Sequence, residues 1–196
     1  MSLTHGDVPL TERSDKYRFK RSSEREEDPL LRSHTSFRIR AVAATDVLAW
    51  AAMRFNLWPE FDAAQMRQEA AEHVARASSL IAVAYIAEDE DAAPVGFIEL
   101  SLRPFSDGCE SMPVPHVEGW YVEKHARGRG VGRALMNAAE AWCRERGFTE
   151  LASDTELANG SSRRAHEALG FSEVDRLVKF RKLLVVEVDG PFPTAP

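Results

Sequence analysis

The sequence predicts an α+β fold in which a mixed, largely antiparallel and splayed sheet is flanked by helices. Three observations support this prediction. A strand leads through a glycine-rich turn into a helix over residues 117–133, short alternating or β-branched segments recur along the chain, and other segments repeat apolar residues at helical spacing. Strand pairs interspersed with amphipathic helices indicate a sheet covered on both faces.

The first half of the chain contains apolar residues at both strand and helix spacing. Alternating or β-branched residues predict strands, and repeats every three or four residues predict helices. Thr45 or Asp46 is placed to cap the first helix, and Trp58-Pro59 ends it. The elements expected here are, in chain order, a strand over 37–42, helices over 45–57 and 62–77, and a hairpin-like strand pair over 80–87 and 95–102.

The second half begins with an irregular, proline-rich loop over 103–115, and loops of this kind often carry binding residues. Gly170 is placed to end the last helix, as glycine commonly does. The elements expected after the loop are a strand over 117–122, a helix over 133–146, a strand over 149–153, a short helix over 161–169 and final strands over 171–188.

The turn between the central strand and its helix has the sequence RGRGVG, at residues 127–132. Its glycines let the backbone approach a ligand without a Cβ clash. The unpaired N–H groups at the helix start favour an anion. Lys124, Arg127, Arg129 and Arg133 add positive charge around it. The turn therefore predicts a ligand that carries phosphate.

Other interpretations of this turn are weaker. A P-loop requires Gly-Lys-Ser/Thr after the glycines, and a dinucleotide-binding fold requires GxGxxG spacing early in the chain; neither is found here. A flexible loop with incidental arginines does not explain why the strand, the turn and the helix occur together. Arg-x-x-Gly-x-Gly after a strand instead resembles the motif of the GNAT superfamily of acetyl-CoA-dependent N-acetyltransferases.

The composition is that of a globular protein. The chain of 196 residues is 44% hydrophobic, carries a net charge of −6 and has no apolar run long enough to span a bilayer. The negative charge argues against a nucleic-acid partner. No signal peptide or disulfide framework is recognisable, so a cytoplasmic protein without a membrane partner is expected. Cys109 and Cys143 lack metal-ligand spacing, and no metal is expected.

Three parts are expected along the chain. Residues 1–36 mix charges densely with few apolar side chains, which predicts a disordered N-terminal extension; a partner-binding arm is the alternative. Residues 37–190 are predicted to form the GNAT N-acetyltransferase domain. Residues 191–196 are predicted to be a C-terminal tail.

Several further motifs resemble one subfamily, the aminoglycoside 6′-N-acetyltransferases. The resemblance covers residues 38–184 and implies the GNAT fold, acetyl-CoA as cosubstrate, and a homodimer formed through the C-terminal strands. Phe105 and Phe180 depart from it, because a tyrosine is expected at each position. The motifs that carry the resemblance are Leu57-Trp58-Pro59, Asp107-Gly108-Cys109-Glu110, Val117-Glu118-Gly119, Ala152-Ser153-Asp154-Thr155, Asn159, His166-Glu167-Ala168-Leu169-Gly170-Phe171, Asp175-Arg176 and Phe180-Arg181-Lys182.

The turn and the resemblance together predict the binding residues. An aminoglycoside is a polycation, so its site needs carboxylates that meet its ammonium groups. Trp58 is also explained as a core residue at a helix end. The predicted substrate contacts are Trp58, Phe105, Glu110, Glu118, Asp154 and Asp175. The predicted acetyl-CoA contacts are Trp120, Tyr121, Val122, Arg127, Gly128, Arg129, Gly130, Val131, Gly132, Arg133 and Asn159.

The expected chemistry assigns three catalytic side chains. Glu118, directly or through water, is predicted to take the proton from the ammonium while Asp154 holds the amine. A backbone N–H at Tyr121 or Val122 would stabilise the developing oxyanion. His166 stands where many GNAT enzymes place a tyrosine facing the sulfur, and it is predicted to protonate the leaving thiolate. A structural histidine on a helix is the alternative.

The leading prediction is acetylation of the 6′-amine of aminoglycosides, which confers resistance. One alternative is a GNAT enzyme that acetylates another amine, such as a polyamine or a protein N-terminus. Another is a non-catalytic, acetyl-CoA-binding sensor. The clustered acids Glu118 and Asp154 favour the first, because a peptide enzyme needs a groove for backbone pairing and a sensor would tolerate the loss of both.

Overall fold

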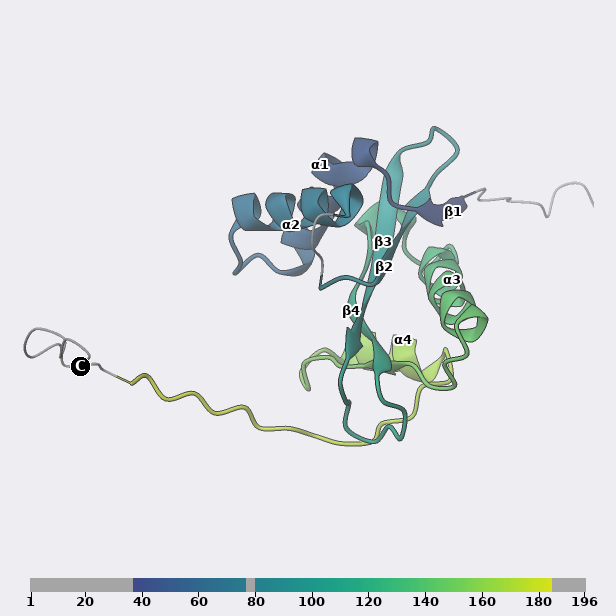
Figure 1. Cartoon of the computed structure of the whole chain (residues 1–196). Coiled ribbons are helices and arrows are strands. Elements are labelled where there is room, and N and C mark those ends of the chain that lie inside the picture. The colour runs from purple at the N-terminus through teal and green to yellow at the C-terminus, as the bar shows by residue number, and fades with distance from the viewer. Residues whose placement is uncertain (1–36, 77–79, 185–196) are drawn as a thin grey trace, which may run out of the picture. The chain divides into compact units, whose positions relative to one another are not determined.

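The computed structural model describes residues 37–76 and 80–184. Within them, five strands form one sheet in the order β1-β2-β3-β4-β5, and Figure 1 shows helices on both of its faces. The first four strands are antiparallel, and β5 runs parallel to β4. The predicted α+β fold with a mixed sheet is therefore confirmed. The strands are β1 (Arg38–Ala41), β2 (Val83–Glu88), β3 (Pro94–Arg103), β4 (Val114–Val122) and β5 (Ala152–Ser153).

In chain order, described helices follow β1, β4 and β5. Four are α-helices: α1 (Val47–Leu57), α2 (Ala63–Ala75), α3 (Val131–Glu145) and α4 (Gly160–Glu167). Two short 3-10 helices, η2 (Ala44–Asp46) and η3 (Lys124–Ala126), precede α1 and α3. None of these helices combines the length and the apolarity that crossing a membrane requires.

Helices α1 and α2 cover one face of the sheet (Figure 1). Trp50 of α1 and Ala70 of α2 are fully buried in a cluster with Ile86 and Phe97 from the strands. The carboxylate of Asp62 caps α2, because it accepts a hydrogen bond of 2.8 Å from the backbone N–H of Gln65.

The capping prediction for α1 is confirmed in position, but the side-chain hydrogen bond is missing. Asp46 does occupy the N-cap position, but its side chain makes no hydrogen bond to the first turn of α1. The carboxylate instead accepts hydrogen bonds from the Arg40 guanidinium and from the backbone N–H of Ala43. The charge-assisted bonds to Arg40 satisfy this carboxylate more strongly than a helix amide would.

Helix α3 covers the other face of the sheet (Figure 1). Its buried residues Leu135, Met136 and Ala139 recur at helical spacing and pack against Ile98 and Leu100 of β3. The helix begins at Val131, two positions before the predicted start. It therefore follows the glycine turn directly.

The ladder between β3 and β4 carries a bulge at Glu118. Glu99 lies opposite Gly119 and Leu100 lies opposite Val117, so Glu118 has no partner residue on β3. An extra residue of this kind bends the strand and re-aims a side chain, and bulges are common beside active sites.

The sheet opens on the other side of β4. Strand β5 pairs with β4 only where Ala152 lies opposite His116 and Ser153 lies opposite Val117. The predicted strand over 149–153 is thus shorter than expected. Among the described residues, the edge of β4 over 118–122 has no neighbouring strand on this side, which leaves backbone groups free for a ligand.

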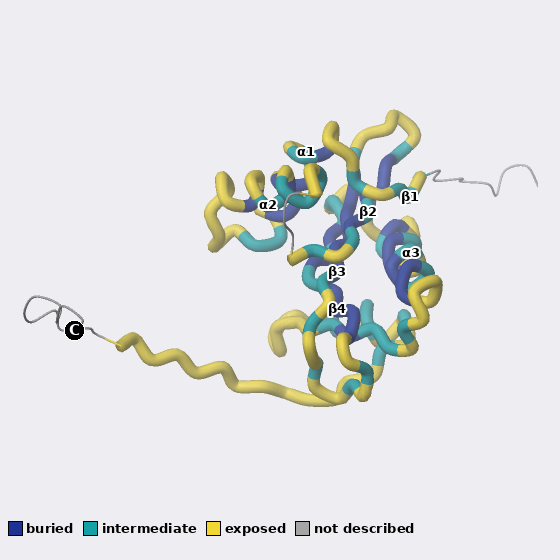
Figure 2. The backbone as a smooth tube through the Cα atoms, in the orientation of Figure 1, coloured by how far each residue is buried: buried dark blue, intermediate teal, exposed yellow. Residues whose placement is uncertain are grey.

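The chain after α4 corrects a second prediction. Strands were expected over 171–188, but residues 171–184 form none, and the remaining four positions lie outside the described residues. A strand needs a neighbour, and no described segment lies beside this one in the sheet. Figure 2 shows the segment exposed along its length. Its exposed apolar side chains are those of Val174, Leu177, Val178, Phe180, Leu183 and Leu184.

The predicted extension at 1–36 and the predicted tail at 191–196 also lie outside the described residues.

Candidate active site

The predicted phosphate-binding turn joins η3 to α3. Gly128 and Gly130 adopt positive φ angles of 74° and 86°, a conformation that costs other residues energy. Gly130 is the N-cap of α3, and no side chain caps the helix. A Cβ atom added at Gly128 would meet nothing within 4 Å, so the turn is open on that side. The helix start therefore presents uncapped backbone N–H groups, as an anion site requires.

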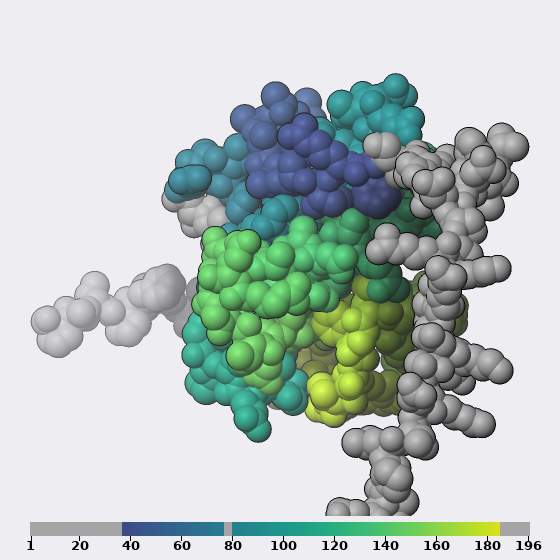
Figure 3. Space-filling model, turned by 90° about the vertical axis from the view of Figure 1, so that its right-hand side faces the viewer, coloured from purple at the N-terminus to yellow at the C-terminus, as the bar shows by residue number. Residues whose placement is uncertain are grey.

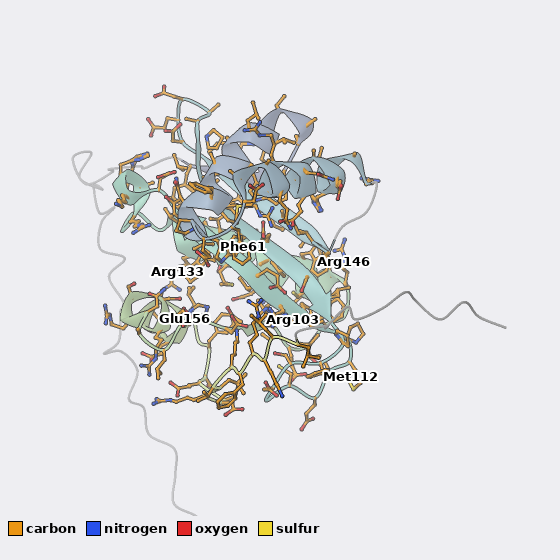
Figure 4. The ribbon with its side chains drawn as sticks, turned by 90° about the vertical axis from the view of Figure 1, so that its left-hand side faces the viewer. Phe61, Arg103, Met112, Arg133, Arg146 and Glu156 are labelled. Atoms are coloured by element: carbon orange, nitrogen blue, oxygen red, sulfur yellow. The ribbon has the colours of Figure 1, made fainter. Side chains whose placement is uncertain are left out.

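Two of the predicted cationic residues also hold the turn in place. Arg127 donates a hydrogen bond of 2.8 Å to the backbone carbonyl of Val122, and its guanidinium lies 5.8 Å from the Tyr121 ring centroid. Arg133, labelled in Figure 4, donates to the backbone carbonyl of Ala168 over 3.2 Å. Each cation therefore joins the turn to a neighbouring segment while adding positive charge.

Trp120 lies against the first turn of α3. Its indole N–H donates to the backbone carbonyl of Gly132 over 3.2 Å, and a Cβ atom at Gly132 would lie only 3.0 Å from the ring. Gly132 thus lets α3 approach the central strand. Trp120 packs the turn onto β4, which is a supporting role distinct from direct ligand contact.

Asn159 is the N-cap of α4. Its side-chain oxygen accepts hydrogen bonds from the backbone N–H of Ser162 and from the hydroxyl of Ser161. This capping role accounts for the residue without a ligand.

Glu118, on β4, is the centre of a side-chain cluster that is separate from the glycine turn. Its Oε1 accepts hydrogen bonds from Arg103 Nε at 2.8 Å and from the Ser101 hydroxyl at 2.5 Å. Its Oε2 accepts from a second nitrogen of Arg103 at 2.7 Å. The pairing is the bidentate arrangement in which guanidinium and carboxylate interact most strongly.

Asp154 joins the same cluster from the segment after β5. Its Oδ2 lies 3.3 Å from the third guanidinium nitrogen of Arg103. Figure 4 labels Arg103, whose guanidinium thereby bridges the two predicted catalytic carboxylates. Glu118 and Asp154 thus converge on one cation, although they are 36 positions apart in the sequence. The cluster also contains His116, which is almost completely buried on β4.

The cluster sets the charge of its members. Burial alone would raise the pKa of Glu118, but the hydrogen bonds from Arg103 and Ser101 outweigh it and lower this pKa below its ordinary value. The hydrogen bonds to Glu118 raise the pKa of Arg103. Burial and the nearby guanidinium lower the pKa of His116. Glu118 is therefore ionised and His116 neutral at neutral pH.

Trp58 lies against the strand beside Glu118. A Cβ atom at Gly119 would come within 2.7 Å of the Trp58 ring, so only glycine admits the ring here. The Arg54 guanidinium lies 5.6 Å from the ring centroid and is itself held by Glu69 and Glu99. The ring is half-buried, so it packs on the core and also borders the cluster.

The other predicted substrate residues lie outside this cluster. Phe105 is 69% exposed in the loop after β3. Glu110 is exposed, and its backbone N–H donates to the Glu150 carboxylate. Asp175 lies on the extended segment after α4, where its carboxylate accepts from the backbone N–H of Arg176. Among the described residues, none of the three forms a hydrogen bond or ion pair with Glu118 or Asp154.

His166 is held by hydrogen bonds at both ring nitrogens. Nδ1 lies 2.8 Å from the backbone carbonyl of Ser162, which only accepts, so Nδ1 carries the hydrogen. Nε2 lies 2.9 Å from the Ser153 hydroxyl, which then donates to it. The ring also makes edge-to-face contacts with Trp120 and Phe171. This arrangement favours the structural interpretation of His166, because neither nitrogen offers a free N–H to a thiolate.

Three members of the cluster were not predicted from the sequence: Ser101, Arg103 and His116. The two-residue period of a strand places His116 on the same face of β4 as Glu118, which was a usable signal. The contribution of Ser101 and Arg103 depends on the register of β3 against β4, and no local pattern reveals that register.

The geometry suits an enzyme with an anionic cofactor next to a cationic acceptor, and comparisons with known proteins agree. The model of the acetyltransferase (GNAT) family matches residues 44–171. The chain belongs to this family.

Its relatives define the subgroup. It is 45% identical over 146 residues to a Klebsiella aerogenes protein named aminoglycoside N(6′)-acetyltransferase type 1, covering 74% of this chain and 96% of the relative. A Stenotrophomonas maltophilia protein of the same name is 42% identical over 73% of this chain and 91% of its own length.

Solved structures agree with this grouping. The aminoglycoside N-acetyltransferase AAC(6′)-Iy, bound to CoA, is 32% identical, with a TM-score of 0.69 over 75% of this chain and 95% of the other. Its complex with the bisubstrate analogue CoA-S-monomethyl-acetylneamine gives the same TM-score over 76% of this chain and 99% of the other.

Proposed function

We propose that this protein transfers the acetyl group of acetyl-CoA to the 6′-amine of aminoglycoside antibiotics and thereby confers resistance. The observation that carries the proposal is the convergence of Glu118 and Asp154 beside the open edge of β4. The same strand leads into the uncapped helix start. Acetyl-CoA and a polycationic amine need these two environments next to each other.

The residues of the turn fit the phosphates of acetyl-CoA. The positive φ angles of Gly128 and Gly130 and the uncapped start of α3 provide backbone donors. The open edge of β4 provides further backbone groups, among them the N–H of Tyr121 or Val122 that we expect to stabilise the oxyanion. Acetyl-CoA supplies the activated acyl group as a thioester. No group of three or more metal-ligating side chains occurs among the described residues, and the proposed transfer uses none.

Glu118 and Asp154 deprotonate and position the acceptor amine. An ammonium has no lone pair, so it must lose a proton before it attacks the thioester carbonyl. Glu118 accepts that proton, and Asp154 holds the amine by a charge-assisted hydrogen bond. The Arg103 guanidinium occupies the position that an incoming ammonium needs on both carboxylates. Binding of the acceptor therefore requires Arg103 to give up part of its pairing.

The cluster also separates this proposal from its alternatives. A sensor of acetyl-CoA has no need of a carboxylate held ionised beside the open strand edge. An enzyme acting on a polyamine shares the need for acids, and only an acceptor series distinguishes it. Relatives of 45% and 42% identity named for the 6′ position of aminoglycosides favour the antibiotic.

We infer that the protein acts in the cytoplasm as a homodimer. Cys109 and Cys143 are both free thiols, as is usual in a reducing compartment. Among the described strands, β5 is an edge of the sheet. A cavity of about 390 Å³ beside it is lined by Leu169, Phe171 and Val174. Figure 3 shows α3 in green and, in yellow-green, the region that includes α4 on this face.

A second copy of the chain would pair the exposed apolar segment after α4 with this edge. The Phe180→Lys/Leu184→Lys double variant should then convert a dimer into a monomer of 21.9 kDa in light scattering. A wild-type protein that is already monomeric contradicts this part of the proposal.

The direct test of the activity is an acetyl-CoA-consumption assay against a panel of acceptors. We expect turnover with kanamycin and tobramycin, which carry a 6′-amine, and none with an aminoglycoside that carries a hydroxyl at that position. Spermidine and a peptide with a free N-terminus complete the panel. Turnover of only spermidine or only the peptide would show that the acceptor is another amine and not the antibiotic.

A further inference from the structure

His116 lies between the two catalytic carboxylates, and the chemistry described above does not use it. The residue is on β4, opposite Ser101 of β3 and Ala152 of β5, and is 1% exposed. Its Nδ1 lies 3.7 Å from Glu118 Oε1, and its Nε2 lies 3.5 Å from Asp154 Oδ2. Each nitrogen thus faces a different carboxylate, just beyond ordinary hydrogen-bond length.

The Nδ1 atom of His116 is buried and has no hydrogen-bond partner among the described residues. Buried polar atoms are nearly always paired, so an unpaired one calls for an explanation. With its hydrogen on Nε2, toward Asp154, the ring presents the lone pair of Nδ1 to an oxygen of Glu118. Two acceptors then face each other, and a proton between them would satisfy both.

Three charged groups face the imidazole. Arg103 from the end of β3 disfavours a cationic ring, as burial also does, whereas Glu118 and Asp154 favour it. The ring is therefore neutral while Arg103 neutralises both carboxylates. When an acceptor ammonium approaches and Arg103 yields part of its pairing, the balance shifts toward an imidazolium held by the two carboxylates.

Glu118 alone is a weak base and holds a proton poorly. Its hydrogen bonds from Arg103 and Ser101 stabilise the ionised form. Imidazole is intrinsically the stronger base of the two groups, and a base works best when its pKa lies near the working pH.

We propose that His116 is a positioning residue of the transfer reaction, acting through Glu118, and that its Nδ1 holds the proton that Glu118 removes from the acceptor ammonium. This inference rests on the proposed function. An N–H bond of the ammonium breaks as an O–H bond forms on Glu118. That O–H bond then breaks as an N–H bond forms at Nδ1, and the positive charge moves from the acceptor to the imidazole.

The remaining steps balance the reaction. The amine lone pair forms the C–N bond and the C–S bond of the thioester breaks. The nitrogen gives its second proton to the departing thiolate, and the proton on His116 returns through Glu118 to solvent. One acetyl group is transferred and one proton is released overall.

The test uses the full-length enzyme and two variants, His116→Gln, which keeps a polar side chain, and His116→Phe, which keeps an aromatic ring. We expect kcat for tobramycin to fall at least about tenfold in both, with KM changed by less than about threefold. The acid limb of the kcat profile should move to lower pH, because the base is then Glu118 alone. The control is His73→Gln, a half-buried histidine that bonds the backbone of Ile81 outside the cluster.

A variant that binds acetyl-CoA like the wild type and keeps both the kcat and its acid limb overturns the inference. If both variants lose acetyl-CoA binding through misfolding, nitrogen-15 NMR of histidine-labelled wild type decides. It should show Nδ1 of His116 without a proton at about neutral pH, and a protonated Nδ1 contradicts the proposal. Failure of the proposed function can be told apart from failure of this inference, because the wild-type enzyme itself would then not turn over tobramycin. The NMR result would still support or overturn the inference.

Discussion

The two parts of the candidate active site use different kinds of chemical group: backbone groups in one and side chains in the other. The turn before α3 uses the backbone of consecutive residues, with two glycines at positive φ and a helix start that no side chain caps. The proposed acceptor cluster uses side chains from β3, β4 and the segment after β5, and the cation Arg103 is shared between its two proposed catalytic carboxylates.

This difference shows how each part is controlled. Backbone donors keep their partial charge at every pH, so their contribution depends on the conformation of the turn. The carboxylates depend on their neighbours, since hydrogen bonds from Arg103 and Ser101 overcome burial and keep the pKa of Glu118 low. Substitutions should therefore separate the two parts cleanly.

Loss of a proposed catalytic carboxylate should have the largest effect. We expect Glu118→Gln to lower kcat/KM for kanamycin or tobramycin by about 100-fold, since general-base catalysis contributes on that order. Asp154→Asn should cost about tenfold or more, or roughly 1.4 kcal/mol of transition-state stabilisation. Steady-state kinetics with the exposed Glu156→Gln as control measures both. Wild-type activity in both variants would show that the carboxylates have no catalytic role.

A single methyl group added to the glycine turn before α3 should weaken acetyl-CoA binding. Gly128 and Gly147 have φ angles of 74° and 79°, and a Cβ at either position meets nothing within 4 Å. Alanine should destabilise the fold similarly at both, by about 1–2 kcal/mol. Only Gly128→Ala should also weaken acetyl-CoA binding, by about tenfold, because only that turn is the proposed phosphate site. Equal acetyl-CoA affinity in the two variants, measured by calorimetry, would remove the phosphate-binding role of the turn.

Removal of Arg103 should change the pH profile. Its hydrogen bonds help to lower the pKa of Glu118, so Arg103→Met should raise that pKa. Activity requires the ionised base and is lost as the pH falls through this pKa. The acid limb of kcat/KM should therefore move to higher pH in the variant. Arg163→Met, which removes an ion pair with Glu173, serves as control. An unmoved limb means that Arg103 does not tune the base.

Glu99 should affect the pH dependence of stability, with no direct effect on turnover. Burial raises its pKa from 4.5 to about 7. Between these values the unfolded chain releases the proton and the folded protein keeps it, so the free energy of unfolding falls as the pH rises, by about 3 kcal/mol in all. Glu99→Gln should remove this component from urea titrations at about pH 5 and pH 8. Glu69→Gln, on the same Arg54, is the control. An identical pH dependence in wild type and Glu99→Gln contradicts the assignment.

The smallest expected effect concerns the predicted N-terminal extension. The family match begins at residue 44, so deletion of residues 1–33 should leave kcat/KM unchanged. A collapse of turnover in the truncated protein would show that these residues belong to the catalytic domain.

The sequence predicted the turn better than the cluster, for a physical reason. RGRGVG is contiguous, and a strand followed by glycines and a helix has few other uses. Arg103 and Ser101 join Glu118 only because β3 and β4 pair in a particular register, with a bulge at Glu118. A bulge depends on the partner strand as much as on its own sequence.

The predicted strands after residue 171 failed for a related reason. The apolar pattern of this segment is that of a strand, but pairing needs a neighbour that the described part of the single chain does not supply. His166 likewise fits its motif, yet its environment can be recognised only from Ser153, Trp120 and Phe171 in three dimensions. Local patterns thus predicted most helices and strands, whereas the side chains that surround Glu118 depend on the register between β3 and β4.

The most direct test of the account is a pair of calorimetric titrations on the same samples. Acetyl-CoA and tobramycin are titrated separately into the wild type, into Gly128→Ala and into the Glu118→Gln/Asp154→Asn double variant. We expect Gly128→Ala to lose affinity for acetyl-CoA alone and the double variant to lose affinity for tobramycin alone, by about tenfold in each case. A variant of one part that weakens both ligands equally would contradict two adjacent but separately built binding environments.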